Sequence, residues 1–524
     1  MKNAIRVSIF AMIIFCLMSY GGIRSPDGEV VFRTTEALAV NGTFAVSGDL
    51  SWKGFGLYKG KDGKRYSLFG PAQAIAAVPL YQIARLINMT GWFQKGHSFV
   101  GISHYINGGL LDFVKDRTPG RFEPHALRTV VSLFNVIVGS MCVFVFFFLI
   151  KALTQSEQSA LLTSILFAFG TLIFPYSGTF FSELLAIFFV MSSLYLLVHR
   201  SIVKKRTASA AYKDIVLAAS GLALGLAAAV HITAVLFAPF FCIYAAFSGP
   251  KDDNPHPPMK RILRNGALFC IGLGLILALI AYYNYIRFDD IFETGRTINV
   301  QIESQRTYGR FVAPWRGLWG LLFSSGKGLF FYCPAILLGF IFWLPFHRKY
   351  RLLSFMILGT VFLRIVFIAS RSDWHGGFCI GPRYMLMIIP FLLLPVGERV
   401  AKIITYGKNK SLLGFAVFSI FCIAQQIYFS LGEIFSYSHV IKWRGMEIGL
   451  DVFKGDYLYL NWDVSPLLYL LNGFRGPLLL KWVGAGNYTL WSWLVLAAGL
   501  LLPLVYFFTL KKNLTEPPSN HLCK

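Results

Sequence analysis

Long apolar runs, separated from one another by short polar segments, occupy most of this chain. Each run has about the ~20 residues that a helix needs to cross a hydrocarbon core of roughly 30 Å. A β-barrel would instead show shorter segments of alternating polarity. The pattern therefore predicts an all-α polytopic membrane protein with about 12 (11–13) transmembrane helices. The runs cover residues 5–23, 128–150, 158–177, 180–199, 214–230, 232–247, 265–287, 328–346, 352–370, 384–399, 411–432 and 489–510.

Two apolar stretches allow more than one interpretation. The run 5–23 follows Lys2 and Arg6, as a signal peptide would, but it lacks an A-x-A-like cleavage site, which favours a retained helix. Residues 71–87 combine an apolar face with Arg85, and we expect them to form a helix in the outer membrane interface. A short span is the alternative for this second stretch.

The distribution of Lys and Arg orients the predicted helices, because basic residues beside spans favour the cytoplasmic side. Lys2 and Arg6 thus place the N-terminus inside. A turn near His231, which splits residues 214–247 into two helices, brings every short basic loop to that side, whereas one long helix would leave three of them outside. We therefore expect a hairpin at His231, cytoplasmic termini and location in the plasma (inner) membrane. The outer (periplasmic) face then holds residues 24–127, 176–183, 288–327, 371–383 and 433–488.

Composition supports a membrane protein and narrows its partners. Charged residues make up 14% of the chain, against roughly 25% in soluble domains. Much of the net charge of +24 lies in short loops, where it meets anionic lipid, and no patch of basic and aromatic residues indicates nucleic acid. Six of the eight cysteines lie inside apolar runs, so we expect neither a disulfide framework nor a zinc site.

Acidic residues are scarce, 25 in all, and three of them are candidates for catalysis. Asp27 and Glu29 directly follow the first run, and a carboxylate fixed at a helix end beside the membrane suits a general base. Glu183 opens the run 180–199, and an ionisable group in a span is a functional candidate by default. The structural alternatives are solvated helix termini for the first two and a helix-capping carboxylate for Glu183.

Basic and polar residues on the outer side predict a site for an anionic group. Lys64 and Tyr66 lie in KGKDGKRYSLFGPAQ, where Asp-Gly predicts a hairpin turn and the cations suit a phosphate. A basic hairpin against lipid headgroups is the alternative. His231, at the predicted turn, is either a ligand contact or a core residue. Gly221 and Gly225 form a GxxxG pair that lets helices approach closely.

The densest polar group lies in the outer loop SRSDWHGGFCIGPRY, residues 370–384. It holds Asp373, His375 and Arg383 among glycines, which permit backbone shapes that other residues disfavour. Cations beside aromatic rings suit an anionic, partly apolar ligand such as a lipid phosphate. A loop anchored in the interface by its aromatic residues is the alternative. Lys327, between two glycines at the end of another outer segment, is a further candidate.

Together these motifs resemble the GT-C superfamily of membrane glycosyltransferases, which includes protein mannosyltransferases and the aminoarabinose transferases of lipid A. A first helix followed at once by an outer acidic motif is typical of that superfamily. The motifs are similar, more specifically, to a set of uncharacterised prokaryotic members, over residues ~1–400. They are YSLFGPAQ (66–73), FFSELLA (180–186), GLALGLAAAVHITA (221–234), SSGKGLFFYCP (324–334) and GGFCIGPRY (376–384).

The resemblance implies a reaction as well as a fold. The donor would be a sugar on a polyprenyl phosphate, the acceptor a glycan, lipid or protein, and the anomeric centre would invert. Asp27 would act as base and Glu183 as second carboxylate, while Lys64, Lys327 and Arg383 would contact the departing phosphate. Some relatives use a divalent metal and others do not, so a metal is possible but no metal ligands are assigned.

The resemblance also implies a division of the chain. Residues 1–432 would form the GT-C-like catalytic module, with its outer loop at 24–127. Residues 433–488 would form an outer segment of unknown role, and 489–524 the last helix and a cytoplasmic tail. The main alternative function is a transporter or flippase of a lipid-linked or anionic substrate, which would usually place charges near the bilayer midplane. A non-enzymatic scaffold is a third possibility.

Overall fold

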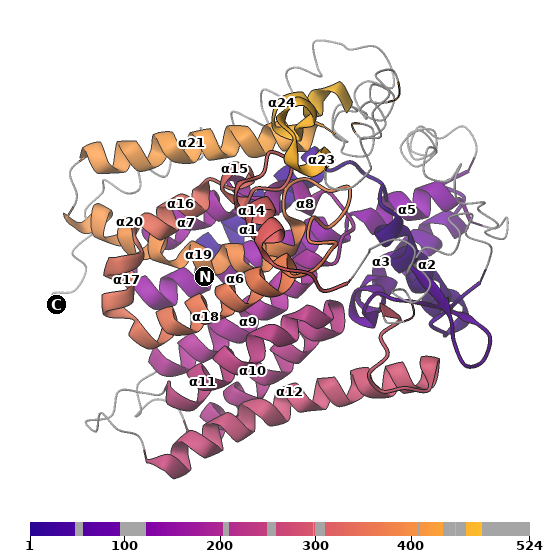
Figure 1. Cartoon of the computed structure of the whole chain (residues 1–524), viewed down its shortest axis with the longest axis horizontal. Coiled ribbons are helices and arrows are strands. Elements are labelled where there is room, and N and C mark those ends of the chain that lie inside the picture. The colour runs from indigo at the N-terminus through magenta and orange to yellow at the C-terminus, as the bar shows by residue number, and fades with distance from the viewer. Residues whose placement is uncertain are drawn as a thin grey trace, which may run out of the picture.

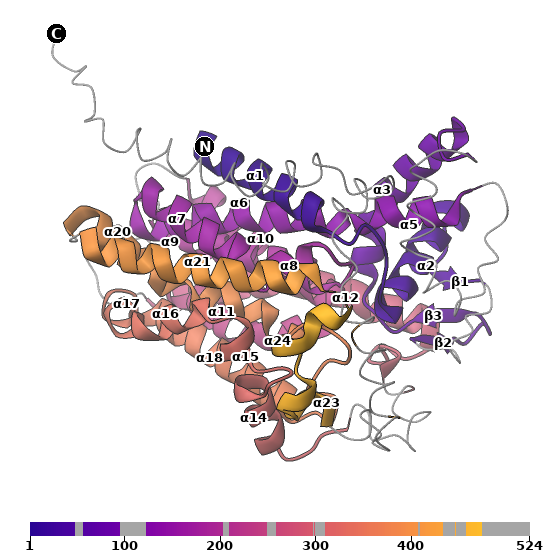
Figure 2. The same cartoon turned by 90° about the horizontal axis from the view of Figure 1, so that it is seen from above.

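The computed structural model of the chain is a bundle of long apolar helices with a smaller polar layer at one end (Figure 1). It describes residues 1–47, 56–94, 122–202, 209–248, 258–296, 310–406, 409–432 and 457–473, and the single residues 298, 437 and 446. The long helices lie side by side, and α2, α3 and α5 gather at one end of them in both views (Figures 1 and 2).

Six helices of the described residues are long and apolar enough to cross a membrane, which confirms a polytopic helical membrane protein. They are Pro124–Thr154 (α5 and α6), Glu183–Ser201 (in α9, Glu183–Ile202), Ala211–Val230 (in α10, Ala210–Val230), Met259–Phe288 (α12), Arg351–Ala369 (α18) and Lys410–Leu431 (in α21, Asn409–Leu431). Shorter apolar helices are Glu157–Phe169 (α7) and Ile232–Phe247, the latter formed by η1 (Ile232–Phe237) and α11 (Ala238–Phe247). The predicted run 489–510 lies outside the described residues.

Three other predicted runs differ from long helices. The first, α1 (Lys2–Met18), begins three residues before the run and ends five residues before the run ends. The next two are broken at prolines, which remove a backbone donor. Run 328–346 forms α15 (Leu329–Tyr332), α16 (Ala335–Ile341) and α17 (Trp343–Lys349), and run 384–399 forms η2 (Arg383–Ile388), α19 (Ile389–Leu392) and α20 (Leu394–Tyr406).

The chain turns at His231, as the distribution of charge predicts. His231 has an extended backbone (φ −142°, ψ 104°) between α10 and η1. Beyond it, α11 returns along the bundle. Its end lies beside the end of α9 and the start of α12, since Arg200 of α9 donates to the carbonyl of Ser248 (2.7 Å) and to Asn265 of α12 (3.1 Å). His231 therefore lies at the bundle end opposite to this group.

Glycines hold α10 and α12 in close contact. A β-carbon at Gly221 would clash with the backbone carbonyl of Phe269, and one at Gly272 would clash with the carbonyl of Ala218. This is the close approach that the GxxxG pair predicts. The two helices run in the same direction, since Arg264 of α12 is ion-paired with Asp214 of α10 near their first turns.

The polar layer at the end of the bundle begins with α2 (Pro26–Asn41) and contains a small sheet. Strands β1 (Ala45–Val46), β2 (Leu57–Lys59) and β3 (Arg65–Ser67) are antiparallel in the order β1-β3-β2. The predicted hairpin turn is confirmed, with Gly63 at φ +79° between β2 and β3. The stretch 71–87 is helical in α3 (Pro71–Met89), which packs on α2 and α5; its depth in the membrane stays a prediction.

Short elements complete the described chain. They are α8 (Ile173–Ser177), α14 (Trp315–Phe323), α23 (Tyr457–Leu460), η3 (Trp462–Val464), α24 (Pro466–Tyr469) and η4 (Leu470–Gly473). Figure 2 shows α23 and α24 beside α14 and α15, so the segment that follows α21 in sequence lies over helices from the middle of the chain. Within Pro124–Thr154, α5 covers Pro124–Ser132 and α6 covers Phe134–Thr154.

Candidate active site

A pocket of about 730 Å³, its open mouth included, lies at the polar end of the bundle. Its wall comes from the start of α2, the link between β3 and α3, the start of α9, the turn between α10 and η1, the last turns of α12 and the start of η2. The polar and charged side chains that line it are Asp27, Ser182, Glu183, His231, Tyr283, Asn284, Arg287, Thr294, Arg296, Arg383 and Tyr384. Segments far apart in sequence therefore share one cavity.

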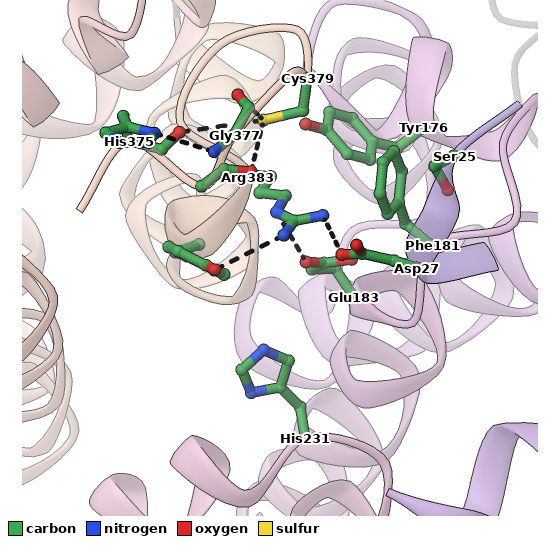
Figure 3. Close-up of polar contacts among 12 residues, drawn as sticks. Ser25, Asp27, Tyr176, Phe181, Glu183, His231, His375, Gly377, Cys379 and Arg383 are labelled. Carbon is green, nitrogen blue, oxygen red and sulfur yellow. Dashed lines mark hydrogen bonds and ion pairs between the residues drawn. The ribbon is translucent and has the colours of Figure 1, made fainter. Parts of the chain in front are cut away.

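Arg383 connects the two carboxylates of the pocket (Figure 3). Its Nη1 lies 2.8 Å from Asp27 Oδ2, and its Nε lies 3.8 Å from Glu183 Oε1. The guanidinium also lies over the rings of Phe181 (4.9 Å) and Tyr384 (5.1 Å). Burial alone would lower the pKa of Arg383, but Asp27, Tyr384 and Glu183 raise it well above its usual value. The guanidinium is therefore a permanent positive charge between two acids.

The start of α2 fixes Asp27 at the pocket wall. Ser25 caps the helix by accepting a hydrogen bond from the backbone of Gly28 (3.0 Å), and Pro26 occupies its first turn. Asp27 thus sits at the positive end of the helix dipole, which favours a carboxylate. Its side chain is 18% exposed, so a ligand in the pocket can reach it.

Glu183 opens α9 and is nearly inaccessible from outside, at 2% exposure. Amide side chains hold the backbone just before it, since Gln73 donates to the carbonyl of Phe180 (3.1 Å) and Asn135 to that of Phe181 (2.7 Å). Its Oε2 accepts no hydrogen bond from the described residues. A buried carboxylate oxygen without a donor is costly, and it can accept a hydrogen bond from a bound hydroxyl group.

His231 lines the same pocket as the two carboxylates (Figure 3). Its Nδ1 is 2.8 Å from the hydroxyl of Thr233, and its ring meets Tyr384 edge-on at 6.1 Å. Arg364, fully buried in α18, donates to both Thr233 and the carbonyl of Tyr384. Sequence reasoning did not select Arg364, although a lone arginine inside an apolar span is itself a signal.

Two further arginines line the pocket. Two hydrogen bonds fix the side chain of Arg287, which donates to the carbonyl of Ser67 (2.6 Å) and to Asn284 (2.7 Å). Arg296 makes no hydrogen bond and no ion pair with any residue in the described part of the chain, and burial lowers its pKa. With Arg383, three arginines face two carboxylates, so the pocket carries a net positive charge that suits an anionic ligand.

Glu29 lies outside this pocket, contrary to its predicted catalytic role. It is 2% exposed and contacts Arg128 of α5 at two positions (2.6 and 3.0 Å) and Arg33 of α2 at 3.0 Å. The helical period explains the difference: Asp27 and Glu29 are two residues apart on α2, so their side chains point in different directions. This carboxylate joins α2 to α5 and is not available to a substrate.

Lys64 and Tyr66 belong to the β2–β3 hairpin and do not line the pocket either. The side chain of Lys64 is 64% exposed and lies 3.4 Å from Asp62. The hydroxyl of Tyr66 donates to Asp62 at 2.9 Å, and burial together with that carboxylate raises the pKa of Tyr66 to about 12. The residues that follow them, from Leu68 to Pro71, do reach the pocket.

The pocket wall contains none of the predicted residues Lys327, Asp373 and His375. Asp373 and His375 belong to the loop that carries Arg383, and Lys327 contacts that loop. Lys327 is buried and donates through Nζ to the carbonyls of Gly377 (2.8 Å) and Cys379 (2.7 Å). Asp373 is tied to a neighbouring arginine by two hydrogen bonds of 2.7 and 2.6 Å. Burial, with Lys327 nearby, lowers the pKa of His375 to about 3, so this histidine is neutral near pH 7.

The pocket residues do not match a metal site. In the part of the chain that the structure describes, no group of three or more His, Cys, Asp or Glu side chains is arranged to hold an ion. Asp27 and Glu183 each place one oxygen, Oδ2 and Oε1, toward Arg383, so a guanidinium already lies between the two carboxylates.

Comparison with known proteins supports the class of protein suggested by this geometry. Residues 94–292 match the family model of dolichyl-phosphate-mannose-protein mannosyltransferases. The predicted GT-C relationship is confirmed. The match supports a membrane glycosyltransferase of the GT-C type. No curated protein sequence matches the chain significantly.

Solved structures with a similar arrangement belong to two proteins. ArnT from Cupriavidus metallidurans is 12% identical, with a TM-score of 0.45 over 79% of this chain and 61% of that one. The same protein bound to undecaprenyl phosphate is 13% identical, with a TM-score of 0.45 over 85% and 70%. The oligosaccharyltransferase from Archaeoglobus fulgidus is 11% identical, with a TM-score of 0.44 over 91% and 60%. The chain thus spans about 60% of the length of the first and third of these structures.

Proposed function

We propose that this protein transfers a sugar from a polyprenyl-phosphate donor to a hydroxyl group of a glycan, lipid or protein on the outer face of the plasma membrane. The observation that carries the proposal is the meeting of Asp27, Glu183 and Arg383 in one pocket. The matching family is named for a sugar linked to a lipid phosphate, and a pocket with net positive charge at a membrane surface suits such a donor.

The reaction is a single displacement with inversion. The Asp27 carboxylate accepts the proton of the acceptor hydroxyl as its oxygen forms a bond to the anomeric carbon of the sugar. The bond between that carbon and the phosphate oxygen breaks on the opposite face, and the lipid phosphate leaves with the electron pair. Glu183, through the oxygen that accepts no hydrogen bond from the described residues, orients a hydroxyl of the sugar or acceptor.

Cations of the pocket stabilise the negative charge on the departing phosphate. The sequence predicts phosphate contacts at Lys64 and Lys327, but neither amine lines the pocket, so the proposal assigns these contacts to other cations. Arg296 takes this role in the proposal, since it lines the pocket and makes no hydrogen bond or ion pair with a described residue. Arg383 contributes by holding Asp27 and by adding positive charge beside it.

The decisive experiment uses the purified full-length protein in liposomes with a panel of labelled polyprenyl-phosphate sugars and a membrane-glycan extract. We expect the wild type to transfer at least one sugar and Asp27→Asn to be slower by about 10²–10⁴-fold, the usual contribution of a general base. Asp289→Asn is the matched control, because Asp289 is exposed and pairs with Lys61 on the surface. Failure of the wild type with every donor, or equal rates for Asp27→Asn and wild type, would refute the proposal.

A further inference from the structure

The segment after α21 packs directly against the two loops behind the pocket. The backbone N–H of Gly326 donates to the carbonyl of Tyr459 at 3.0 Å, and a β-carbon on Gly326 would lie 2.7 Å from Tyr459 Cα. Ser465, fully buried, donates to the carbonyl of Ser325 at 2.7 Å. One backbone hydrogen bond and one donated by a serine side chain therefore join residues 457–473 to the turn that contains Lys327.

Tyr459 also contacts the loop 371–383. Its ring stacks on that of His375, with centroids 4.0 Å apart and an interplanar angle of 17°, and the ring of Trp374 lies at 6.3 Å. The ammonium group of Lys327 is 5.2 Å from the centre of the Tyr459 ring. Tyr459 is only 8% exposed, so it is an internal part of this packing and not a surface group.

The contacts continue from Tyr459 to the pocket. Lys327, beside the Tyr459 ring, donates to the carbonyls of Gly377 and Cys379, and the backbone of Gly377 donates to Nδ1 of His375 at 2.9 Å. Gly376, Gly377 and Gly381 in this loop all have positive φ angles, and ordering glycines costs more conformational entropy than ordering other residues. The loop then delivers Arg383 to Asp27.

We propose that residues 457–473 support the substrate site from behind, and that Tyr459 is a positioning residue: its packing on His375 and Lys327 holds the loop 371–383 in the shape that presents Arg383 to the pocket. The segment contributes no side chain to the pocket wall among the described residues. The expected effect of this segment on catalysis rests on the proposed transferase function, whereas its expected effect on the loop 371–383 does not.

The loop can be tested without any activity, because Cys379 lies within it and is 2% exposed. Purified full-length protein in lipid nanodiscs is treated with a maleimide, and the peptide containing Cys379 is followed by mass spectrometry. We expect Tyr459→Ala to raise the labelling rate about tenfold or more, as local opening becomes easier. Tyr459→Phe should protect Cys379 like the wild type. Unchanged protection in Tyr459→Ala would overturn the inference.

Two further variants separate positioning from general damage to the segment. Tyr469→Ala removes the same side chain from a half-exposed position ten residues further on, and we expect it to leave Cys379 protected. Tyr459→Leu keeps apolar volume without the aromatic ring, and it replaces Tyr459→Ala in the labelling experiment if that variant does not accumulate. Equal labelling of Cys379 in Tyr469→Ala and Tyr459→Ala would show general loosening and would also overturn the inference.

Sugar transfer tests the second half of the inference. Tyr459→Ala should lower kcat by about tenfold or more, since small misplacements of charged groups are costly, and Tyr459→Phe should restore it. In an Arg383→Gln background, Tyr459→Ala should cause little further loss, because both changes act through the same contact. Independent, additive losses would overturn the role through Arg383. If no variant, wild type included, transfers sugar, the proposed function fails while the labelling result still decides the packing.

Discussion

Arg383 contacts the two pocket carboxylates through different nitrogens, Nη1 for Asp27 and Nε for Glu183. A guanidinium is planar and always charged, so it fixes both the distance between its partners and their electrostatic environment. Lysine would keep the charge but offers a single point contact. The arrangement of the acids therefore depends on the shape of this side chain as well as on its charge.

In the proposed reaction Arg296 contacts the donor phosphate, since it lines the pocket and makes no hydrogen bond or ion pair with a described residue. We expect Arg296→Ala to weaken binding of undecaprenyl phosphate by about tenfold, as for loss of one charge-assisted contact, with no loss of thermal stability. Binding is measured by titration of the purified protein in detergent. Arg399→Ala, an exposed arginine near the other end of the bundle, is the control. Equal affinity of Arg296→Ala and wild type would contradict this role.

The pocket residues differ in how far sequence could predict them. Asp27, Glu183, His231 and Arg383 all reach the pocket, because each lies at the end of a helix or in the loop that opens one. Position on the outer side does not specify where a long side chain points. Lys327 shows this, since its partners are the carbonyls of Gly377 and Cys379.

At the scale of elements, the buried ion pair between Glu29 and Arg128 fixes α2 against α5. Removing one partner of such a pair leaves an uncompensated buried charge, which costs about 3–5 kcal/mol. We therefore expect Glu29→Gln to lower the thermal unfolding temperature in detergent markedly. Glu157→Gln is the matched control, because Glu157 is half-exposed and 3.6 Å from Lys151, and exposed pairs contribute about 0–1 kcal/mol. Similar unfolding temperatures for the two variants would contradict this expectation.

The helices that sequence predicted best are those without internal proline. Long apolar runs have few structural alternatives in lipid, where the backbone must satisfy its own hydrogen bonds, and α9, α12 and α18 agree with their runs. Run 328–346 contains Pro334, and run 384–399 contains Pro390 and Pro395. Hydropathy does not register these breaks, so the runs were predicted as single spans although the structure divides them.

For the whole molecule, the turn at His231 places the polar pocket and the basic loops at opposite ends of the bundle. An outward-facing pocket then requires Lys64 to be outside and Lys260, near the start of α12, to be inside. We expect a membrane-impermeant amine reagent to modify Lys64 in intact cells and Lys260 only after permeabilisation, as read from labelled peptides. Both residues are exposed. Modification of Lys260 in intact cells would contradict the orientation.

The packing of residues 457–473 behind the pocket also has a consequence for biosynthesis. Asp27 is synthesised well before Tyr459, and the loop that carries Arg383 acquires its support from Tyr459 only after α21 has been synthesised. A chain still emerging from the ribosome therefore has its carboxylates long before it has a finished pocket. Nascent or truncated chains that end before Tyr459 would insert in the membrane without a competent site.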